Sequence, residues 1–149
     1  MEARAPALMP AMVEPRDALL RRALAGNALF SAVSGAVMIL GSRRISDFTG
    51  LSPAWAPAAI GAAVLCWAVA VALLARSAEL RPALVRLVIA GDLAWVTASY
   101  AVLIAGEPSL TAAGVWSVGI LAEIVALFGI VQYLGLRRLR AERGVASYR

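Results

Sequence analysis

The chain has 149 residues, of which 62% are hydrophobic and only 15% charged, and its mean hydropathy is +0.82. A soluble domain of this length rarely reaches that apolar fraction, because its helices need polar faces. The net charge of +5 could attract nucleic acid, but the arginines flank the apolar segments and do not line one face. The composition therefore predicts a single-domain membrane protein and no nucleic-acid partner.

Reactive side chains are scarce. The chain contains no lysine and no histidine, and Cys66 is its only cysteine. These absences exclude a Schiff base on lysine, any metal or haem site that depends on imidazole, an intrachain disulfide and a CxxC redox pair. We expect Cys66 to be an inert buried thiol. We also expect that the protein binds no metal or cofactor and that it is not an enzyme.

Four apolar segments follow an N-terminal stretch, 1–17, that holds three prolines and predicts a flexible cytoplasmic tail. At about 1.5 Å per residue, each segment is long enough for a hydrocarbon core about 30 Å thick. The short connections 76–81 and 106–109 predict antiparallel neighbours, and 42–56 is the longest loop. The expected transmembrane helices are about 19–41, 57–75, 82–105 and 110–136, within a domain that covers 18–136.

The sequence thus predicts an all-α fold, a polytopic membrane protein built as an antiparallel up-down-up-down bundle of four transmembrane helices. A basic cytoplasmic tail, 137–149, would follow it and attract anionic lipid headgroups. Arginines are distributed unevenly between the two expected sides. One side carries Arg4, Arg16, Arg21, Arg22, Arg76, Arg81, Arg86, Arg137, Arg138, Arg140, Arg143 and Arg149, and the other carries Arg43 and Arg44, partly offset by Asp47 and Glu107.

The positive-inside rule then places both termini in the cytoplasm. Abundant alanine and arginine without lysine indicate a GC-rich bacterial genome, so the expected location is the bacterial inner membrane.

Polar groups occur at depth in three of the four segments. Asn27, Ser31 and Ser34 share one face of the first helix, and Asp92 and Ser99 share one face of the third. Glu123 lies within the fourth. Counted from the cytoplasmic boundary, Asn27, Asp92 and Glu123 lie roughly 7, 14 and 20 Å deep. Together with the three serines, they predict an inward-facing polar ladder of six residues. Gln132 falls on the opposite face from Glu123, and we expect it at the headgroups.

Two interpretations of this ladder stay open. In the first, Asp92 bonds to Asn27 or to a serine hydroxyl, Glu123 bonds to a backbone carbonyl or to its symmetry mate, and the bonds fix helix register. In the second, the ladder binds a proton or a small polar or cationic ligand, because intramembrane acids commonly mark functional sites.

The runs RALAGNALFSAVSG (22–35) and DLAWV (92–96) resemble small four-helix bacterial inner-membrane proteins of unassigned function. This resemblance implies the fold and the compartment and supplies no activity. By architecture the chain is also similar to small multidrug resistance transporters. It departs from them because their essential glutamate lies on the first helix, where this chain has Asn27, and because its arginine bias is too one-sided for a subunit that inserts both ways.

Two functions follow as expectations, and a third, an enzyme, is not expected. The first is an accessory or assembly subunit of a membrane complex, which suits the small size, the short loops and the lack of reactive side chains. The alternative is an oligomeric small-solute or proton-coupled transporter that uses Asp92 and Glu123. An enzyme acting on lipid or quinone would depend on these two acids alone. In either of the first two cases we expect a homo-oligomer or a subunit of a larger assembly in the lipid bilayer.

Overall fold

The computed structural model describes residues 17–106 and 108–146, with side chains described as far as residue 141. All regular secondary structure in these residues is α-helical, which confirms the all-α prediction. The helices are α1 (Ala18–Leu40), α2 (Ser42–Thr49), α3 (Ala56–Arg76), α4 (Pro82–Ala105) and α5 (Ala112–Ala146). Four of them are long and apolar enough to cross a membrane, namely α1, α3, α4 and the Ala112–Ala141 part of α5. The predicted N-terminal tail lies, apart from Asp17, outside the described residues.

Helix ends coincide with local sequence signals. Pro57 and Pro82 stand in the first turns of α3 and α4, where a missing N–H leaves no intrahelical bond unmade. Gly50 and Gly106 end α2 and α4 in the left-handed region, with φ of 79° and 64°. Glycine takes this conformation without steric cost, so both helices stop where the sequence allows the chain to turn.

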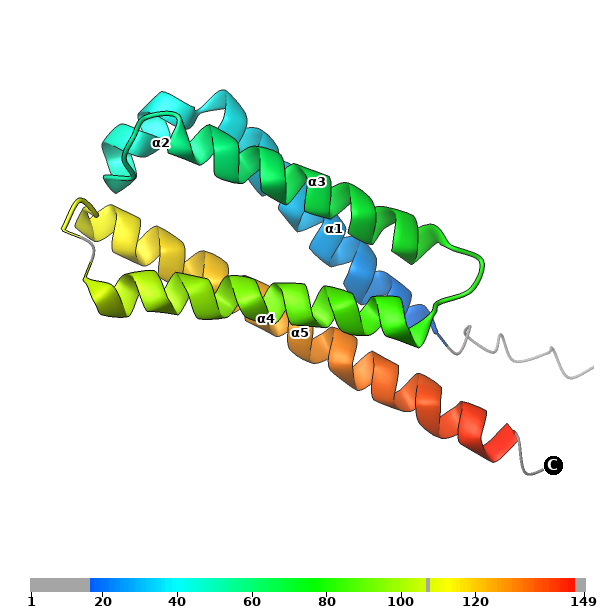
Figure 1. Ribbon diagram of the computed structural model, residues 1–149. Coiled ribbons are helices and arrows are strands. Elements are labelled where there is room, and N and C mark those ends of the chain that lie inside the picture. The colour runs from blue at the N-terminus through cyan, green and yellow to red at the C-terminus, as the bar shows by residue number, and fades with distance from the viewer. Residues whose placement is uncertain (1–16, 107, 147–149) are drawn as a thin grey trace, which may run out of the picture.

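The long helices pack as two pairs, α1 with α3 and α4 with α5, and α1 also packs against α5 (Figure 1). The short connection 106–111 therefore joins close neighbours, as expected. The connection 77–81 does not, because α3 and α4 make only slight contact along their length. Side chains make the contact between these two helices, since the Trp67 ring of α3 lies against Gly91 of α4.

Two predicted boundaries need correction. The expected loop 42–56 contains the helix α2, and the fourth long helix continues ten residues past its expected end at Leu136. Residues 137–146 are thus helical rather than a separate tail. The extension has a packing reason, because Leu136 and Leu139 are buried in the same apolar cluster as Leu20 and Leu80. Cys66 is exposed, so the expectation of a buried thiol is wrong.

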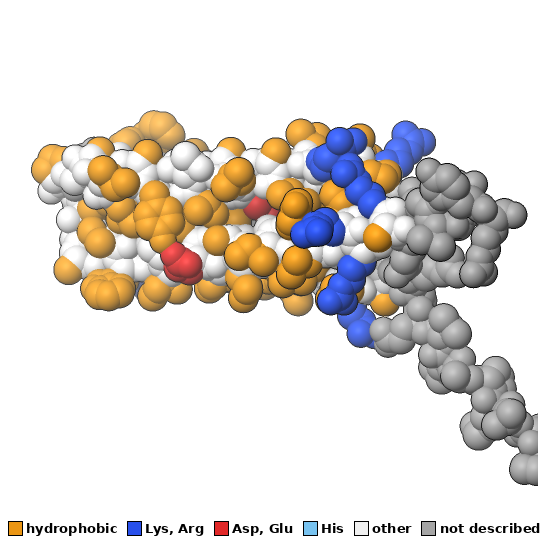
Figure 2. All heavy atoms as spheres, turned by 90° about the horizontal axis from the view of Figure 1, so that it is seen from below, with side chains coloured by type: hydrophobic (Ala, Val, Ile, Leu, Met, Phe, Trp, Pro, Cys, Tyr) orange, Lys and Arg blue, Asp and Glu red, His pale blue; other side chains and the backbone are white. Residues whose placement is uncertain are grey.

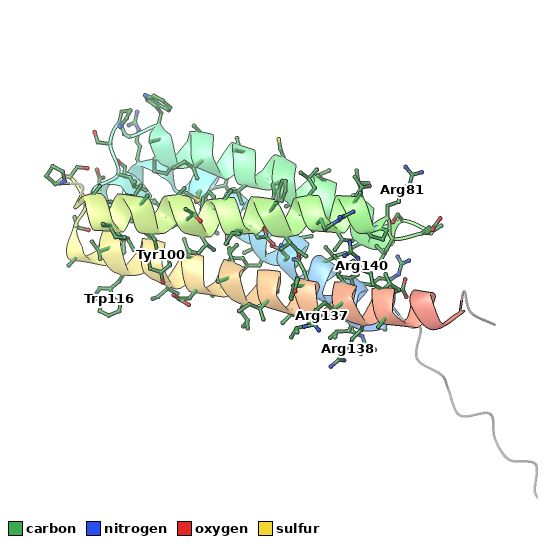
Figure 3. All side chains as sticks on the ribbon, turned by 60° about the horizontal axis from the view of Figure 1, so that its bottom comes forward. Arg81, Tyr100, Trp116, Arg137, Arg138 and Arg140 are labelled. Atoms are coloured by element: carbon green, nitrogen blue, oxygen red, sulfur yellow. The ribbon has the colours of Figure 1, made fainter. Side chains whose placement is uncertain are left out.

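On the face seen in Figure 2, the arginines lie at one end, and hydrophobic side chains are spread over the rest of its length. Arg81, Arg137, Arg138 and Arg140 lie toward this end, whereas Tyr100 and Trp116 lie toward the other (Figure 3). The helix α2, with Arg43 and Arg44, also lies at the end opposite to the arginine-rich one (Figure 1).

Candidate functional site: a buried polar centre

Asp92 lies on the inward face of α4. The buried residues of α4 are Val85, Val88 and Asp92, spaced at i, i+3 and i+7, which defines one narrow stripe. The carboxyl group follows two valines along this stripe into the bundle, and the residue is only 3% exposed. The prediction that Asp92 faces inward is therefore confirmed.

Asn27 on α1 is the nearest partner of this carboxyl group. Its side-chain nitrogen Nδ2 donates to Asp92 Oδ2 at 2.7 Å, and its oxygen Oδ1 accepts from Ser31 Oγ at 3.3 Å. Both Asn27 and Ser31 are buried. The three groups predicted on two helices thus form one continuous hydrogen-bonded chain from Ser31 through Asn27 to Asp92.

Gln132 on α5 supplies a second donor that sequence reasoning missed. Its Nε2 donates to Asp92 Oδ2 at 3.2 Å, and the residue is completely buried. The expectation that Gln132 lies at the headgroups is therefore wrong. A signal for its burial exists in the sequence, because it belongs to a stripe spaced alternately by three and four residues: Ala122, Val125, Gly129, Gln132, Leu136 and Leu139.

Glu123 does not belong to this centre. It is exposed on the outer surface of α5, where one carboxyl oxygen accepts a hydrogen bond from the Tyr100 hydroxyl of α4. The prediction that Glu123 faces inward with Asp92 is wrong. Glu123 and Gln132 do lie on opposite faces of α5, as expected, but the inward face is the one with Gln132.

Ser34 and Ser99 lie apart from the polar centre as well. Both are half-buried and line a cavity of about 520 Å³ that extends toward α2 and is otherwise largely apolar. The Ser99 hydroxyl donates to the Trp95 carbonyl at 2.9 Å, within its own helix. The six residues of the predicted ladder therefore do not form one array. Asn27, Ser31 and Asp92 form a buried centre, Ser34 and Ser99 line the cavity near α2, and Glu123 faces outward.

A smaller cavity of about 180 Å³ adjoins Asp92. Its lining includes Ser31 of α1, Trp67 of α3 and Trp95 of α4. Gly91 makes room for Trp67, whose ring atoms would collide with a Cβ at that position. Among the described residues, the buried Trp95 Nε1 and Gln132 Oε1 have no hydrogen-bond partner.

Chemically, the centre can act in two ways. Its hydrogen bonds join α1, α4 and α5 at one level and so can hold their relative register. The Asp92 carboxyl can also take up a proton, and the cavity beside it leaves an indole N–H without an acceptor. The residues described here include no group of three or more His, Cys, Asp or Glu side chains placed to hold a metal ion.

The fold and the polar centre define an all-helical protein with four helices capable of crossing a membrane. Comparisons with protein-family models, with curated proteins and with solved structures found no match to the chain.

Proposed function

We propose that the protein is a non-catalytic integral protein of the bacterial inner membrane that serves as an accessory or assembly subunit of a membrane complex. In this proposal the four long helices cross the bilayer in alternating directions, up-down-up-down, with both termini in the cytoplasm. The clustering of arginines at one end supports this orientation, because positively charged flanks stay on the cytoplasmic side (Figure 2).

The outward position of Glu123 is the observation that carries the proposal. An acid that meets lipid near the middle of a transmembrane helix costs about 2.5–3.5 kcal/mol on insertion scales. Tyr100 satisfies one oxygen of the carboxyl group, and the residue remains exposed on the surface of the single chain. A partner that covers Glu123 with a hydrogen-bond donor would remove most of this cost.

The exposed residues around Glu123 have the spacing of a helix-packing surface. Trp116, Ile120, Leu127 and Ile130 are all more than half exposed and, with Glu123, repeat at alternating intervals of four and three residues along α5. This spacing produces the straight apolar seam with which one helix packs against another. We define these five residues as the outer seam of α5.

A different protein fits this seam better than a second copy. In a parallel pair of identical chains, residues of equal depth meet, so Glu123 would face another Glu123 or a Tyr100 hydroxyl that already donates within its own chain. Along α5, the nearest described cation beyond the seam is Arg137, about 21 Å away by helical rise. We therefore infer a partner transmembrane helix that carries its own donor or cation.

Affinity purification from native membranes in mild detergent, followed by native mass spectrometry, tests this function. We expect a stoichiometric complex with a second membrane protein, lost in Glu123→Leu and kept in the control Leu73→Ala, which alters an exposed leucine on α3. A protein that purifies alone or only with itself, or a complex that survives Glu123→Leu, would contradict the accessory-subunit function.

The cavity beside Asp92 favours one alternative, a transporter for a small cationic solute. Trp67, Trp95 and the Asp92 carboxyl group contribute to its lining, and aromatic faces with a carboxylate suit an organic cation. Adding tetramethylammonium to the purified protein in weak buffer tests it. Release of protons that Asp92→Asn abolishes would favour transport over the accessory function, and no release would exclude this cation as the coupled solute.

A further inference from the structure

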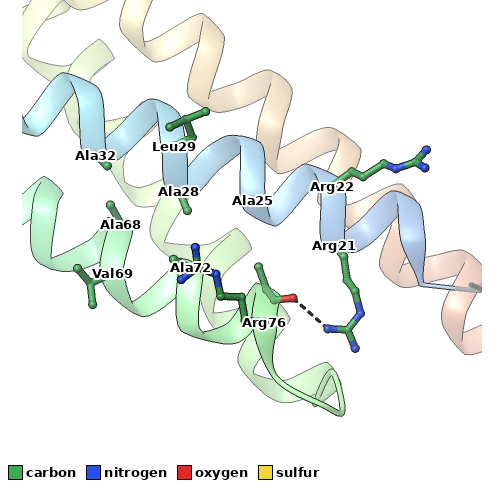
Figure 4. A pocket seen from close by; sticks show the side chains of 11 residues that line it. Arg21, Arg22, Ala25, Ala28, Leu29, Ala32, Ala68, Val69, Ala72 and Arg76 are labelled. Carbon is green, nitrogen blue, oxygen red and sulfur yellow. Dashed lines mark hydrogen bonds between the residues drawn. The ribbon is translucent and has the colours of Figure 1, made fainter.

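A second surface feature lies on a different pair of helices from the outer seam. Between α1 and α3, at the arginine-rich end, runs a groove of about 490 Å³ (Figure 4). Alanines form most of its walls: Ala25, Ala28 and Ala32 from α1, and Ala68, Ala72 and Ala75 from α3. Their side chains are too short to fill the space between the two helices, so the groove is narrow, apolar and open to the outside.

The length of the groove corresponds to one leaflet of a bilayer. It extends along α1 from Arg21 to Ala32, which is about 16 Å by helical rise. Half of a hydrocarbon core about 30 Å thick is about 15 Å. The groove therefore begins where headgroups meet the core and ends near the midplane, as an acyl chain of that leaflet does.

Arg21, Arg22 and Arg76 surround the headgroup end of the groove. Arg21 is already engaged, because it donates to the carbonyl oxygens of Ala75 at 2.9 Å, Ser77 at 2.6 Å and Ala78 at 3.2 Å, and it pairs with Asp17. These bonds hold the C-terminal end of α3 against α1 and so fix the mouth of the groove. The guanidinium of Arg21 is therefore already occupied by acceptors within the protein.

Arg76 is in a different situation. It is exposed in the last turn of α3, and no hydrogen bond or ion pair joins it to another side chain in the described part of the chain. Figure 4 shows its side chain extending alongside Ala72. A guanidinium placed there presents a planar set of donors that matches phosphate oxygens.

We propose that this groove binds one acyl chain of an anionic phospholipid, whose phosphate meets the Arg76 guanidinium. The apolar walls suit an acyl chain, and the length of the groove matches the depth that such a chain reaches in one leaflet. The arginines at the mouth of the groove suit an anionic headgroup. This site goes beyond the proposed function, because it uses neither the outer seam nor the polar centre. It would add one resident lipid at the α1–α3 face whichever protein covers α5.

Native mass spectrometry of the full-length protein with equimolar phosphatidylglycerol and phosphatidylcholine of identical chains tests the proposal. We expect one phosphatidylglycerol to be retained at least about tenfold more tightly than phosphatidylcholine, because the choline ammonium offsets the charge of the phosphate in phosphatidylcholine and so weakens its charge-assisted bond to Arg76. Arg76→Gln should abolish this preference. Ala25→Leu should fill the groove and weaken binding of both lipids, and because Ala25 is exposed, the substitution does not disturb the core.

Two matched controls make the outcome decisive. Arg138→Gln removes an exposed arginine at the same end, and Ala90→Leu enlarges an exposed alanine on α4; neither should change lipid binding. Equal retention of both lipids by the parent protein would overturn the proposal. So would unchanged binding in Ala25→Leu, or a loss in Arg138→Gln as large as that in Arg76→Gln.

Discussion

Asn27 on α1 and Asp92 on α4 are joined by a buried hydrogen bond of 2.7 Å, although the backbones of the two helices do not pack against each other. Each residue belongs to a different helix pair, α1 with α3 and α4 with α5 (Figure 1). Their side chains thus bridge the two halves of the bundle at one level, and Gln132 from α5 completes the same centre.

Removing the carboxyl group should be costly. In Asp92→Leu the donors on Asn27 and Gln132 stay buried without their acceptor, and each unpaired donor costs about 1–3 kcal/mol. Asp92→Asn keeps an oxygen that can accept and should lose less than half as much. Unfolding of the purified protein by denaturing detergent measures the difference, and an Asp92→Leu variant as stable as the parent would show that the bridge contributes nothing.

The two amides that donate to Asp92 should not contribute equally. Asn27 uses both its donor and its acceptor, whereas Gln132 makes one longer bond and leaves its Oε1 without a partner. Replacing Gln132 by leucine removes this unsatisfied acceptor together with the bond. We expect Gln132→Leu to cost about 1 kcal/mol less than Asn27→Leu in the same unfolding assay. An equal or larger loss in Gln132→Leu would contradict this ranking.

Close contact between α1 and α3 depends on two facing glycines. A Cβ on Gly35 would lie 2.7 Å from the Gly61 carbonyl oxygen, and a Cβ on Gly61 would lie equally close to that of Gly35. Gly35→Ala should therefore force the helices apart and cost about 1–3 kcal/mol. Gly119→Ala is the control, because its Cβ would meet nothing closer than 4.0 Å, and it should be neutral or slightly stabilising. Thermal unfolding of both variants checks this contrast.

Arg21 should stabilise the end of α3 that it caps. Its guanidinium donates to the carbonyl oxygen of Ala75 in the last turn of that helix and to those of Ser77 and Ala78 just beyond it, where carbonyls lack intrahelical donors. Since the side chain is partly exposed, Arg21→Gln should cost only about 1–2 kcal/mol. Hydrogen exchange should then speed up at residues 75–80. Exchange that changes equally in Arg138→Gln would refute a local capping role.

The extent of correct sequence prediction has a physical explanation. Long apolar segments and their Pro and Gly boundaries are local features, so four helices and the inward face of α4 could be read directly. The prediction for Glu123 was wrong because an acid in the middle of a transmembrane helix ordinarily faces inward. Its partner, Tyr100, lies on another helix, so only the packing of α4 on α5 could reveal that the outward position is hydrogen-bonded. The burial of Gln132 could have been predicted from the alternating spacing of three and four residues in the stripe to which it belongs.

The preference of α3 for α1 over α4 also could not be read from loop lengths. It rests on the close approach of Gly35 to Gly61, and this pairing depends on which glycines face each other across two helices. The extension of α5 depends likewise on Leu136 and Leu139 meeting Leu20 and Leu80 from other segments.

A double-mutant cycle in the detergent-unfolding assay tests the central claim, that Asp92 is bound to Asn27 inside the bundle and is independent of Glu123. With Asn27→Leu and Asp92→Leu, the account predicts a coupling energy of about 0.6–1.7 kcal/mol, between the average and the largest value found by such cycles for hydrogen bonds between transmembrane helices. With Asp92→Leu and Glu123→Leu it predicts coupling close to zero. Coupling between Asp92 and Glu123 that equals or exceeds the coupling between Asp92 and Asn27 would contradict it.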